Sequence, residues 1–330
     1  MNEVQHVLKI LSKAIVRETA AFNYYYKQSE NESIPLEVKG LLSRLAEEER
    51  THRRLLMNEY ISIEKGWDEH WSEEAGPVLT YPIPEEPPLR DIDVSPCLEA
   101  IAISLPAVLV GGDNIVTSVI KDKSKNITGT FLTLYDVMGH GLQTTDINAF
   151  ANRILGEYID SAGSFTLDSD TLFPRNVVKH LNMAMSERFE GQGVFLTMLC
   201  ALFHTAKSEL SYTIAGHEPP FVIRKNGDIE SLLNTQLVVG IDAEFPYRQS
   251  TIEFNRGDVF CVFSDGIIEA RNVEGDMFGR ERVADILRKS AGIAPEEMIN
   301  RLMADLRDFA GGTPLNDEIS IVLVSAREEL

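Results

Sequence analysis

The first sixty residues repeat apolar side chains with the period of an amphipathic helix. In residues 2–29 and again in residues 36–61 these side chains recur at steps of three and four, so they share one helix face. In the second segment this face consists of Val38, Leu42, Leu45, Glu49, His52 and Leu56. Residues 31–35 break the pattern, and Pro35 suits the first turn of a new helix. The sequence therefore predicts two antiparallel helices joined by a short loop, a helical hairpin.

After residue 90 the pattern changes to short apolar runs bounded by turn residues, which are typical of strands. The predicted strands are 98–105, 114–120, 131–135, 196–204, 209–215, 221–225, 229–233, 251–254, 259–264 and 319–325. Helical periods predict further helices at 144–160, 173–190, 279–290 and 295–309. Strand hairpins with helices inserted in groups favour layered α+β structure over regular βαβ units.

A proline-rich acidic segment separates these two regions. It contains Pro77, Pro82, Pro84, Pro87 and Pro88, a composition that favours an extended chain over a helix or a central strand. We therefore expect a helical domain over residues 1–65, a linker over 66–92 and an α+β domain over 93–330.

The charge and the cysteine content narrow the possible partners. The formal net charge is -20, and no basic cluster stands out that would follow nucleic acid or an anionic membrane. Cys97, Cys200 and Cys261 lie far apart among apolar residues, as expected of reduced core thiols. The longest apolar run, 100–110, is too short to span a bilayer, and the N-terminus has no signal-peptide pattern. These features predict a cytoplasmic protein without a nucleic-acid or membrane partner.

Three residues on the apolar faces of the hairpin have side chains that bind metals. Glu18 stands on the first helix, and Glu49 and His52 stand on the second. A di-iron carboxylate bundle takes a Glu from two helices and Glu-x-x-His from two others, so this hairpin offers half of such a site. Residues 18–25 and 45–56 resemble rubrerythrin-like and other ferritin-like domains. The resemblance implies iron bound between two copies of the hairpin.

A different interpretation of the hairpin needs no metal. Glu49 and His52 then pair with each other or with arginines, and the hairpin only dimerises. In both interpretations half a bundle leaves an apolar face uncovered, so we expect a homodimer.

Four aspartates stand at the ends of predicted strands, beside glycine or other turn residues. They are Asp113, Asp136, Asp265 and Asp317. Each alone is an ordinary turn or cap residue. Together they supply the several oxygen ligands that hard divalent cations require. The sequence therefore predicts that these strand ends meet at a site for two cations.

A series of motifs surrounds these aspartates in a fixed order. They are Val-Gly-Gly-Asp at 110–113, Asp-Val-Met-Gly-His-Gly at 136–141, Phe-Leu-Thr at 195–197, Ala-Gly-His-Glu-Pro-Pro at 215–220, Ser-Asp-Gly at 264–266, Met-Phe-Gly-Arg-Glu-Arg at 277–282 and Asp-Glu-Ile-Ser at 317–320. Over about residues 95–326 the chain resembles PPM-type serine/threonine phosphatases of the stage II sporulation protein E branch. The resemblance implies an α-β-β-α sandwich with two Mn²⁺ or Mg²⁺ ions.

The resemblance also implies roles for individual residues. Asp136 matches the aspartate that bridges both metals, and Val137 offers its backbone carbonyl. Asp265 and Asp317 match the other principal ligands, and Asp113 lies at the metal site. His140 either protonates the leaving oxygen or only fixes the glycine-rich turn, and the sequence leaves both roles open.

Two further polar residues in these motifs are not assigned as catalytic groups or principal metal ligands. His217 lies in a proline-rich turn, and we interpret it as structural. The last motif reads Asp317-Glu318, where the family usually has a pair of aspartates. The first acid keeps its place, so the principal ligands are all present.

Three functions from different classes follow. The first is a metal-dependent phosphatase that acts on phosphoserine or phosphothreonine of a small anti-sigma-factor antagonist-like protein and is regulated by its N-terminal hairpin. The second is a catalytically silent phosphatase fold that binds a partner as an adaptor. The third is an iron or redox sensor whose main activity lies in the hairpin. Retention of all four aspartates favours the first.

Overall fold

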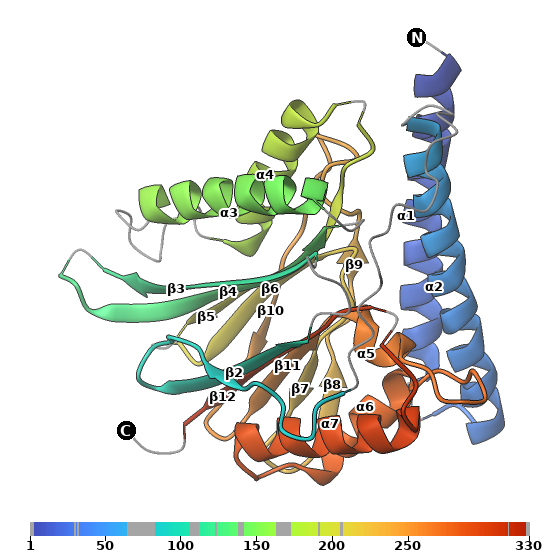
Figure 1. Cartoon of the computed structure of the whole chain (residues 1–330). Helices are drawn as coiled ribbons and strands as arrows, with labels where there is room; N and C mark the ends of the chain where they lie inside the picture. The colour runs from blue at the N-terminus through green and yellow to red at the C-terminus, as the bar shows by residue number, and fades with distance from the viewer. Residues whose placement is uncertain are drawn as a thin grey trace.

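Two β-sheets lie face to face in the computed structural model, and helices cover their outer sides (Figure 1). The structure describes residues 3–29, 31, 33–64, 83–105, 112–122, 124–137, 142–162, 173–190, 192–204, 207–315 and 317–327. The first sheet has the order β1 (Arg90–Asp91), β2 (Leu98–Leu105), β12 (Ile319–Ala326), β11 (Val259–Phe263), β7 (Phe221–Ile223) and β8 (Ile229–Ser231). The second has the order β10 (Ser250–Glu253), β6 (Glu209–Ala215), β5 (Leu196–His204), β4 (Ile127–Val137) and β3 (Asp113–Lys121), and β9 (Thr235–Gln236) pairs with β6.

Each sheet packs against its own pair of helices. Helices α3 (Leu142–Ala162) and α4 (Pro174–Arg188) pack on the second sheet, and α6 (Arg280–Lys289) and α7 (Pro295–Ala310) pack on the first (Figure 1). A five-residue helix, α5 (Asp265–Glu269), follows β11. The predicted α-β-β-α sandwich is confirmed.

Strand β4 shows why the central strands are apolar on both faces. Phe131 and Tyr135 pack against α3 and α4, whereas Leu132 and Leu134 belong to the core between the sheets. Successive side chains of a strand point to opposite faces, and here both faces are covered. A continuous apolar run is the result, and it leads the chain into the turn after Asp136.

The N-terminal hairpin stands beside one end of the sandwich (Figure 1). Helices α1 (Glu3–Ser29) and α2 (Leu36–Glu64) pack along each other. Ile15 of α1 and Met57 of α2 form an apolar cluster with Phe195, Leu237 and Val238 of the sandwich. The hairpin therefore contacts the α+β region directly.

The buried face of α2 differs from the face that the apolar pattern predicted. Its buried side chains are Ala46, Arg50, Arg53 and Met57. Val38 and His52, which belong to the predicted face, are exposed. The difference arises because two arginines occupy the buried face, and a search for apolar residues passes over them.

The chain returns to described structure at residue 83, within the proline-rich segment. Ile83 joins the core beneath α7, and Arg307 of α7 donates hydrogen bonds to the carbonyl oxygens of Pro84 and Glu85 at 2.9 and 3.2 Å.

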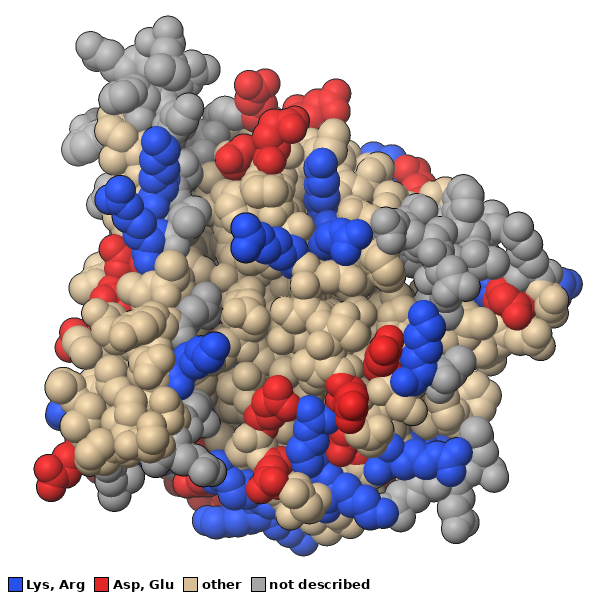
Figure 2. Space-filling view, turned by 180° about the vertical axis from the view of Figure 1, so that it is seen from behind, with Lys and Arg blue, Asp and Glu red and all other residues tan. Residues whose placement is uncertain are grey.

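Among the described residues no helix combines the length and the apolar content needed to cross a membrane. From behind, acidic and basic side chains lie close together along the lower part of the molecule (Figure 2).

Candidate metal centre and active site

Two aspartates face each other across neighbouring strands of the second sheet. Asp113 begins β3, Asp136 is the last but one residue of β4, and the antiparallel register pairs them directly. A Cβ atom on Gly112 would overlap the Asp136 carboxylate and the carbonyl oxygen of Val137. Glycine is required here because it lets the backbone approach both oxygen-bearing groups.

The other carboxylates come from the first sheet. Asp265 begins α5 just after β11, and Asp317 and Glu318 precede β12, which pairs with β11. A Cβ atom on Gly266 would overlap the carbonyl oxygen of Glu318, so glycine allows α5 to begin this close to β12. The Ser264 hydroxyl donates a hydrogen bond to the same carbonyl oxygen at 3.2 Å and fixes the junction.

The carboxylates of the two sheets meet at one end of the sandwich. Ligand atoms of Asp113, Asp136 and Glu318 all lie within 4.8 Å of one another. The backbone N–H of Asp113 also donates a hydrogen bond to Glu318 Oε1 at 2.5 Å, which ties β3 to the start of β12. Asp317 lies exposed at the rim.

Burial and mutual repulsion raise the pKa values of this cluster. Burial, followed by the charges of Asp113, Asp265, Asp317 and Glu318, raises the pKa of Asp136 well above its usual value. Burial and the charge of Glu318 do the same to the pKa of Asp113. Burial and the charge of Asp317 raise the pKa of Asp265 to about 6. Without a counter-charge this cluster retains protons that isolated carboxyl groups lose.

The donor set suits divalent cations. Both carboxylate oxygens of Asp113 are buried, and the hydroxyls of Ser320 and Ser264 only partly offset the effect of burial on its pKa. Buried carboxylates are costly, and Mn²⁺ and Mg²⁺ take oxygen ligands of this kind. Cations bound here would offset the repulsion and satisfy these oxygens. The group of Asp113, Asp136 and Glu318 therefore fits a divalent cation. Asp265 and Asp317 lie outside this group, although their charges raise the pKa of Asp136, and the predicted ligand set for two ions stays a prediction.

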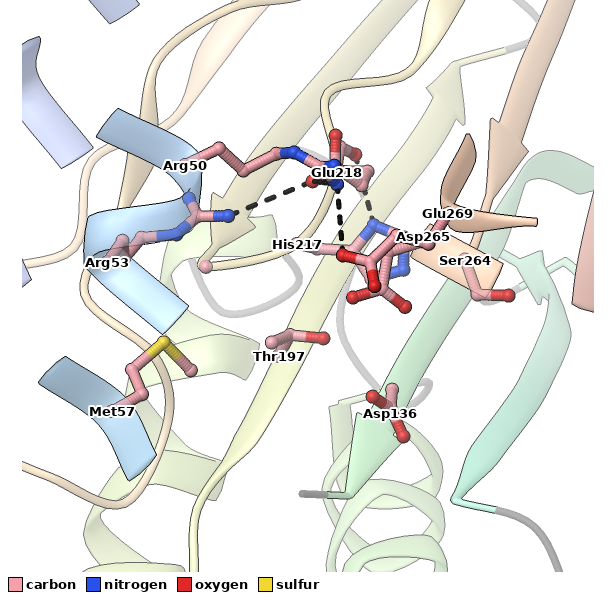
Figure 3. Close-up of a pocket in the computed structure, with 11 residues that line it drawn as sticks. Arg50, Arg53, Met57, Asp136, Thr197, His217, Glu218, Ser264, Asp265 and Glu269 are labelled. Carbon is pink, nitrogen blue, oxygen red and sulfur yellow. Dashed lines mark hydrogen bonds and ion pairs between the residues drawn. The ribbon is translucent and has the colours of Figure 1, made fainter. Parts of the chain in front are cut away.

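A pocket opens beside this cluster (Figure 3). Asp136, Thr197, Ser264 and Asp265 lie on one side, and Arg50, Arg53 and Met57 of α2 lie on the other. Gly216, His217, Glu218 and Glu269 complete the lining. The hairpin therefore forms one wall of the pocket that Asp136 and Asp265 line.

Comparison with known families decides the classification. The sequence pattern of the family described as Stage II sporulation protein E (SpoIIE) matches residues 128–327, which is more than half of the chain. The chain belongs to the SpoIIE family. The predicted resemblance to PPM-type phosphatases is confirmed, and the sandwich is a PPM-type phosphatase domain. The ferritin-like resemblance of the hairpin stays a prediction.

Two curated relatives support this membership. "Phosphoserine phosphatase RsbU" of Bacillus subtilis is 28% identical over 232 residues, which cover 69% of this chain and 63% of that protein. "Protein IcfG" of a Synechocystis species is 24% identical over 149 residues, covering 45% of this chain and 23% of that protein. The chain thus spans less than two thirds of the length of either relative.

Solved structures share the fold. The SiaA-PP2C domain of Pseudomonas aeruginosa superposes with a TM-score of 0.59 at 20% identity, covering 70% of this chain and 86% of that one. The RsbU and RsbW domains of Rv1364c from Mycobacterium tuberculosis give 0.56 at 19% identity, covering 73% and 64%. A Bacillus subtilis SpoIIE structure with the phosphatase domain and a fragment of the regulatory domain gives 0.51 at 14% identity and covers 97% of this chain and 96% of that one.

The structure of this SpoIIE-family chain describes only one of the two histidines for which the sequence suggested a role. His140 lies outside the described residues, so its two proposed roles stay open. His217 is buried, and its Nδ1 lies 3.0 Å from the carbonyl oxygen of Glu218, to which it can donate. Burial lowers the pKa of His217, so it is neutral near pH 7.

Sequence reasoning missed Glu318 as a member of the cluster. From the sequence, Glu318 is only a departure from the family's usual pair of aspartates. In the structure Glu318 lies against Asp113 and Asp136. The adjacent acids before a strand were the available signal, and a glutamate side chain is long enough to reach across to the second sheet.

The predicted half-site of the hairpin is brought together. Ligand atoms of Glu18, Glu49 and His52 lie within 4.8 Å of one another. His52 Nδ1 is 3.2 Å from Glu49 Oε2 and 3.9 Å from Glu18 Oε2. A hydrogen bond between the two carboxyl groups raises the pKa of Glu18 and lowers that of Glu49. Whether this group binds iron or only pairs internally stays a prediction.

Proposed function

We propose that this protein is a metal-dependent phosphatase of phosphoserine and phosphothreonine in proteins. The observation that carries the proposal is the grouping of carboxylates from both sheets. Asp113 and Asp136 of the second sheet group with Glu318 of the first, and Asp136 and Asp265 line the pocket beside this group. Their raised pKa values show a concentration of negative charge that two divalent cations would offset.

The chain's own residues would hold and orient the ions. Asp136 faces Asp113 and groups with Glu318 of the first sheet, so it would be a central ligand, and the Val137 carbonyl would be a further one. Two bound cations would lower the pKa of a shared water and offset charge on the phosphoryl oxygens. Thr197 pairs with Asp136 in the β4–β5 register and lines the pocket next to it.

A protein nucleophile is not needed for this chemistry. Burial raises the pKa of Cys200 well above its usual value and that of Cys261 to about 12, so neither forms a thiolate near neutral pH. His217 lines the pocket, but as a neutral imidazole it is a poor proton donor to the leaving serine oxygen. That proton comes from water or from His140.

The proposed substrate is a small phosphorylated regulatory protein of the anti-sigma-factor antagonist type. Similarity to RsbU, named as a phosphoserine phosphatase, and to a structure of RsbU and RsbW domains supports this class.

The hairpin is proposed to regulate the phosphatase as a homodimer with a di-iron site. The grouping of Glu18, Glu49 and His52 supports that part of the proposal, and an iron or redox sensor is the alternative function of the same residues.

The test is dephosphorylation of purified phosphorylated antagonist proteins by the full chain with Mn²⁺. We expect release of phosphate from a phosphoserine-bearing antagonist and no release in excess chelator. Binding of the phosphoprotein without phosphate release would instead identify the adaptor. Iron analysis of the purified protein, with His52→Ala as the comparison, tests the sensory site separately.

A further inference from the structure

One polar side chain of α3 contacts both strands that carry the aspartates of the second sheet. The Tyr135 hydroxyl donates a hydrogen bond to Asn152 Oδ1 at 2.9 Å, and Asn152 Nδ2 donates one to Asn114 Oδ1 at 3.1 Å. Tyr135 belongs to β4 and Asn114 to β3, and helix α3 lies over both strands (Figure 1). Asn152 therefore links three elements through one amide group.

The two residues that Asn152 links are the neighbours of the aspartates. Asn114 follows Asp113 in β3. Tyr135 precedes Asp136 in β4, and the antiparallel register pairs it with Asn114. Successive side chains of a strand point to opposite faces of a sheet. The aspartates point toward the first sheet, where a carboxylate of that sheet groups with them, so Asn114 and Tyr135 point toward α3. Asn152 thus holds the two strands from the face opposite the carboxylates.

Strand β3 needs such a link because it is the last strand of the second sheet. Among the described strands it pairs only with β4, so it has ladder hydrogen bonds on one side only. At its first residue, the backbone N–H of Asp113 donates a hydrogen bond to Glu318 Oε1. At this end β4 therefore holds β3 within the sheet, Glu318 holds it from the first sheet, and Asn152 holds it from the helix layer.

Burial makes the link to β4 costly to break. Tyr135 is fully buried, and Asn152 is half-buried. A buried hydroxyl that loses its acceptor destabilises the folded state. The acceptors of the Tyr135 hydroxyl are Asn152 Oδ1 and the carbonyl oxygen of Asn148, which lies at 3.3 Å. Both belong to α3 and are one helical turn apart, so the hydroxyl fixes β4 against a defined turn of the helix.

We infer that Asn152 is a positioning residue of the proposed metal centre. By holding β3 and β4 together it fixes the distance between Asp113 and Asp136, and with it the geometry in which these carboxylates receive a divalent cation. Metal affinity depends on the residues that orient the ligands as well as on the ligands themselves. The inference rests on the proposed function, because it assigns a role at the centre on which that function depends.

The experiment compares Mn²⁺ affinity, measured by calorimetry, in wild type, Asn152→Ala, Tyr135→Phe and the double variant. Asn152→Ala loses both hydrogen bonds and should weaken Mn²⁺ binding by about tenfold. Tyr135→Phe keeps the hydrogen bond to Asn114 and should weaken it by about threefold. The double variant should bind Mn²⁺ about as Asn152→Ala does, because both changes act on one network. Urea denaturation in chelator confirms that each variant is folded under the conditions of the titration.

Ser211→Ala is the matched control for the loss of a buried hydrogen bond. Ser211 is buried in the same sheet, and its hydroxyl lies 2.9 Å from Thr251 Oγ1. It pairs with Leu202, near the end of β5 that lies away from the aspartates. This variant should lower the free energy of unfolding and leave the Mn²⁺ affinity unchanged. If Asn152 only stabilises the fold, Asn152→Ala should behave in the same way.

The Mn²⁺ dependence of activity gives a second readout that simple instability does not imitate. With p-nitrophenyl phosphate, Asn152→Ala should need about tenfold more Mn²⁺ than wild type for its half-maximal rate. The rate at saturating Mn²⁺ should change much less, because the ligands themselves are unaltered. An equal loss of rate at all Mn²⁺ concentrations would contradict the positioning role.

Failure of the inference is distinguishable from failure of the proposed function. In an active wild type, unchanged Mn²⁺ affinity on Asn152→Ala, or a change that Ser211→Ala shares, would overturn the inference alone. If Asn152→Ala does not fold, Tyr135→Phe decides, and unchanged Mn²⁺ affinity in that variant would overturn the inference. If the wild type binds Mn²⁺ but hydrolyses no phosphoester, weaker binding by Asn152→Ala still supports the positioning role. A wild type that binds no Mn²⁺ would overturn both.

Discussion

Asp265 shows how burial prepares a carboxylate for a cation and makes it costly in the metal-free protein. Its pKa is raised from 3.8 to about 6, first by burial and then by the charge of Asp317. Between these two values the folded state holds a proton that the unfolded state has lost. The free energy of unfolding of the metal-free protein should therefore fall as pH rises from about 4 to about 6. Above about pH 6, Asp265 should not lower it further.

Replacing Asp265 with Asn should remove this penalty. In chelator, the variant should unfold with the same free energy as wild type near pH 4 and be more stable by about 3 kcal/mol at pH 7. Urea denaturation at several pH values measures the difference. Asp305→Asn, at an exposed position of α7, serves as the control and should show no such trend. A difference for Asp265→Asn that does not vary with pH would contradict this explanation.

At the scale of elements, the junction of β11, α5 and β12 positions two of the predicted ligands. Gly266 allows the first turn of α5 to lie against the backbone at Glu318. Ser264 closes the junction, since its hydroxyl accepts a hydrogen bond from the backbone N–H of Ser320 at 2.9 Å. A side chain at position 266 must push these elements apart and so displace Asp265.

Gly266→Ala should therefore destabilise the protein by about 2 kcal/mol and weaken Mn²⁺ binding. Urea denaturation and calorimetry measure the two effects. Gly156→Ala is the matched control because nothing lies within 4 Å of its added Cβ in the middle of α3. That change should stabilise the helix by up to about 1 kcal/mol. Equal effects of the two substitutions would show that close approach at Gly266 is not needed.

The elements also show which parts of the structure a sequence can reveal. Strand β5 spans 196–204 as predicted, because its apolar run and bounding turns are local signals. Helix α5 was missed because five residues are too few to display a helical period. The buried face of α2 differs from the predicted one because Arg50 and Arg53 lie on it, close to Glu218, which is far along the chain. Partners distant in sequence leave no local pattern.

At the scale of the whole molecule, the hairpin has one face on the sandwich and another that exposes apolar side chains. Ile10 and Leu55 are 54% and 56% exposed, and Leu41 is 49% exposed. Four-helix bundles bury such faces between hairpins, and Glu18, Glu49 and His52 offer half of a di-iron site. A second copy of the hairpin is the proposed partner of this face.

Light scattering should accordingly give twice the chain mass of 36.9 kDa at micromolar concentration. Leu55→Glu should yield monomers because it places a charge in the apolar contact. Val273→Glu alters an even more exposed apolar residue of the sandwich, 71% exposed, and should leave the dimer intact. A monomeric wild type would contradict both the dimer and the shared di-iron site.

Asp136 is the residue on which the proposed two-metal phosphatase depends most. The direct measurement is Mn²⁺-dependent hydrolysis of p-nitrophenyl phosphate by the full chain and by Asp136→Asn. We expect activity in the wild type that requires Mn²⁺ or Mg²⁺, and a loss of about a thousandfold in kcat/KM in the variant. Activity that survives the substitution, or wild-type hydrolysis that persists in excess chelator, would contradict the account.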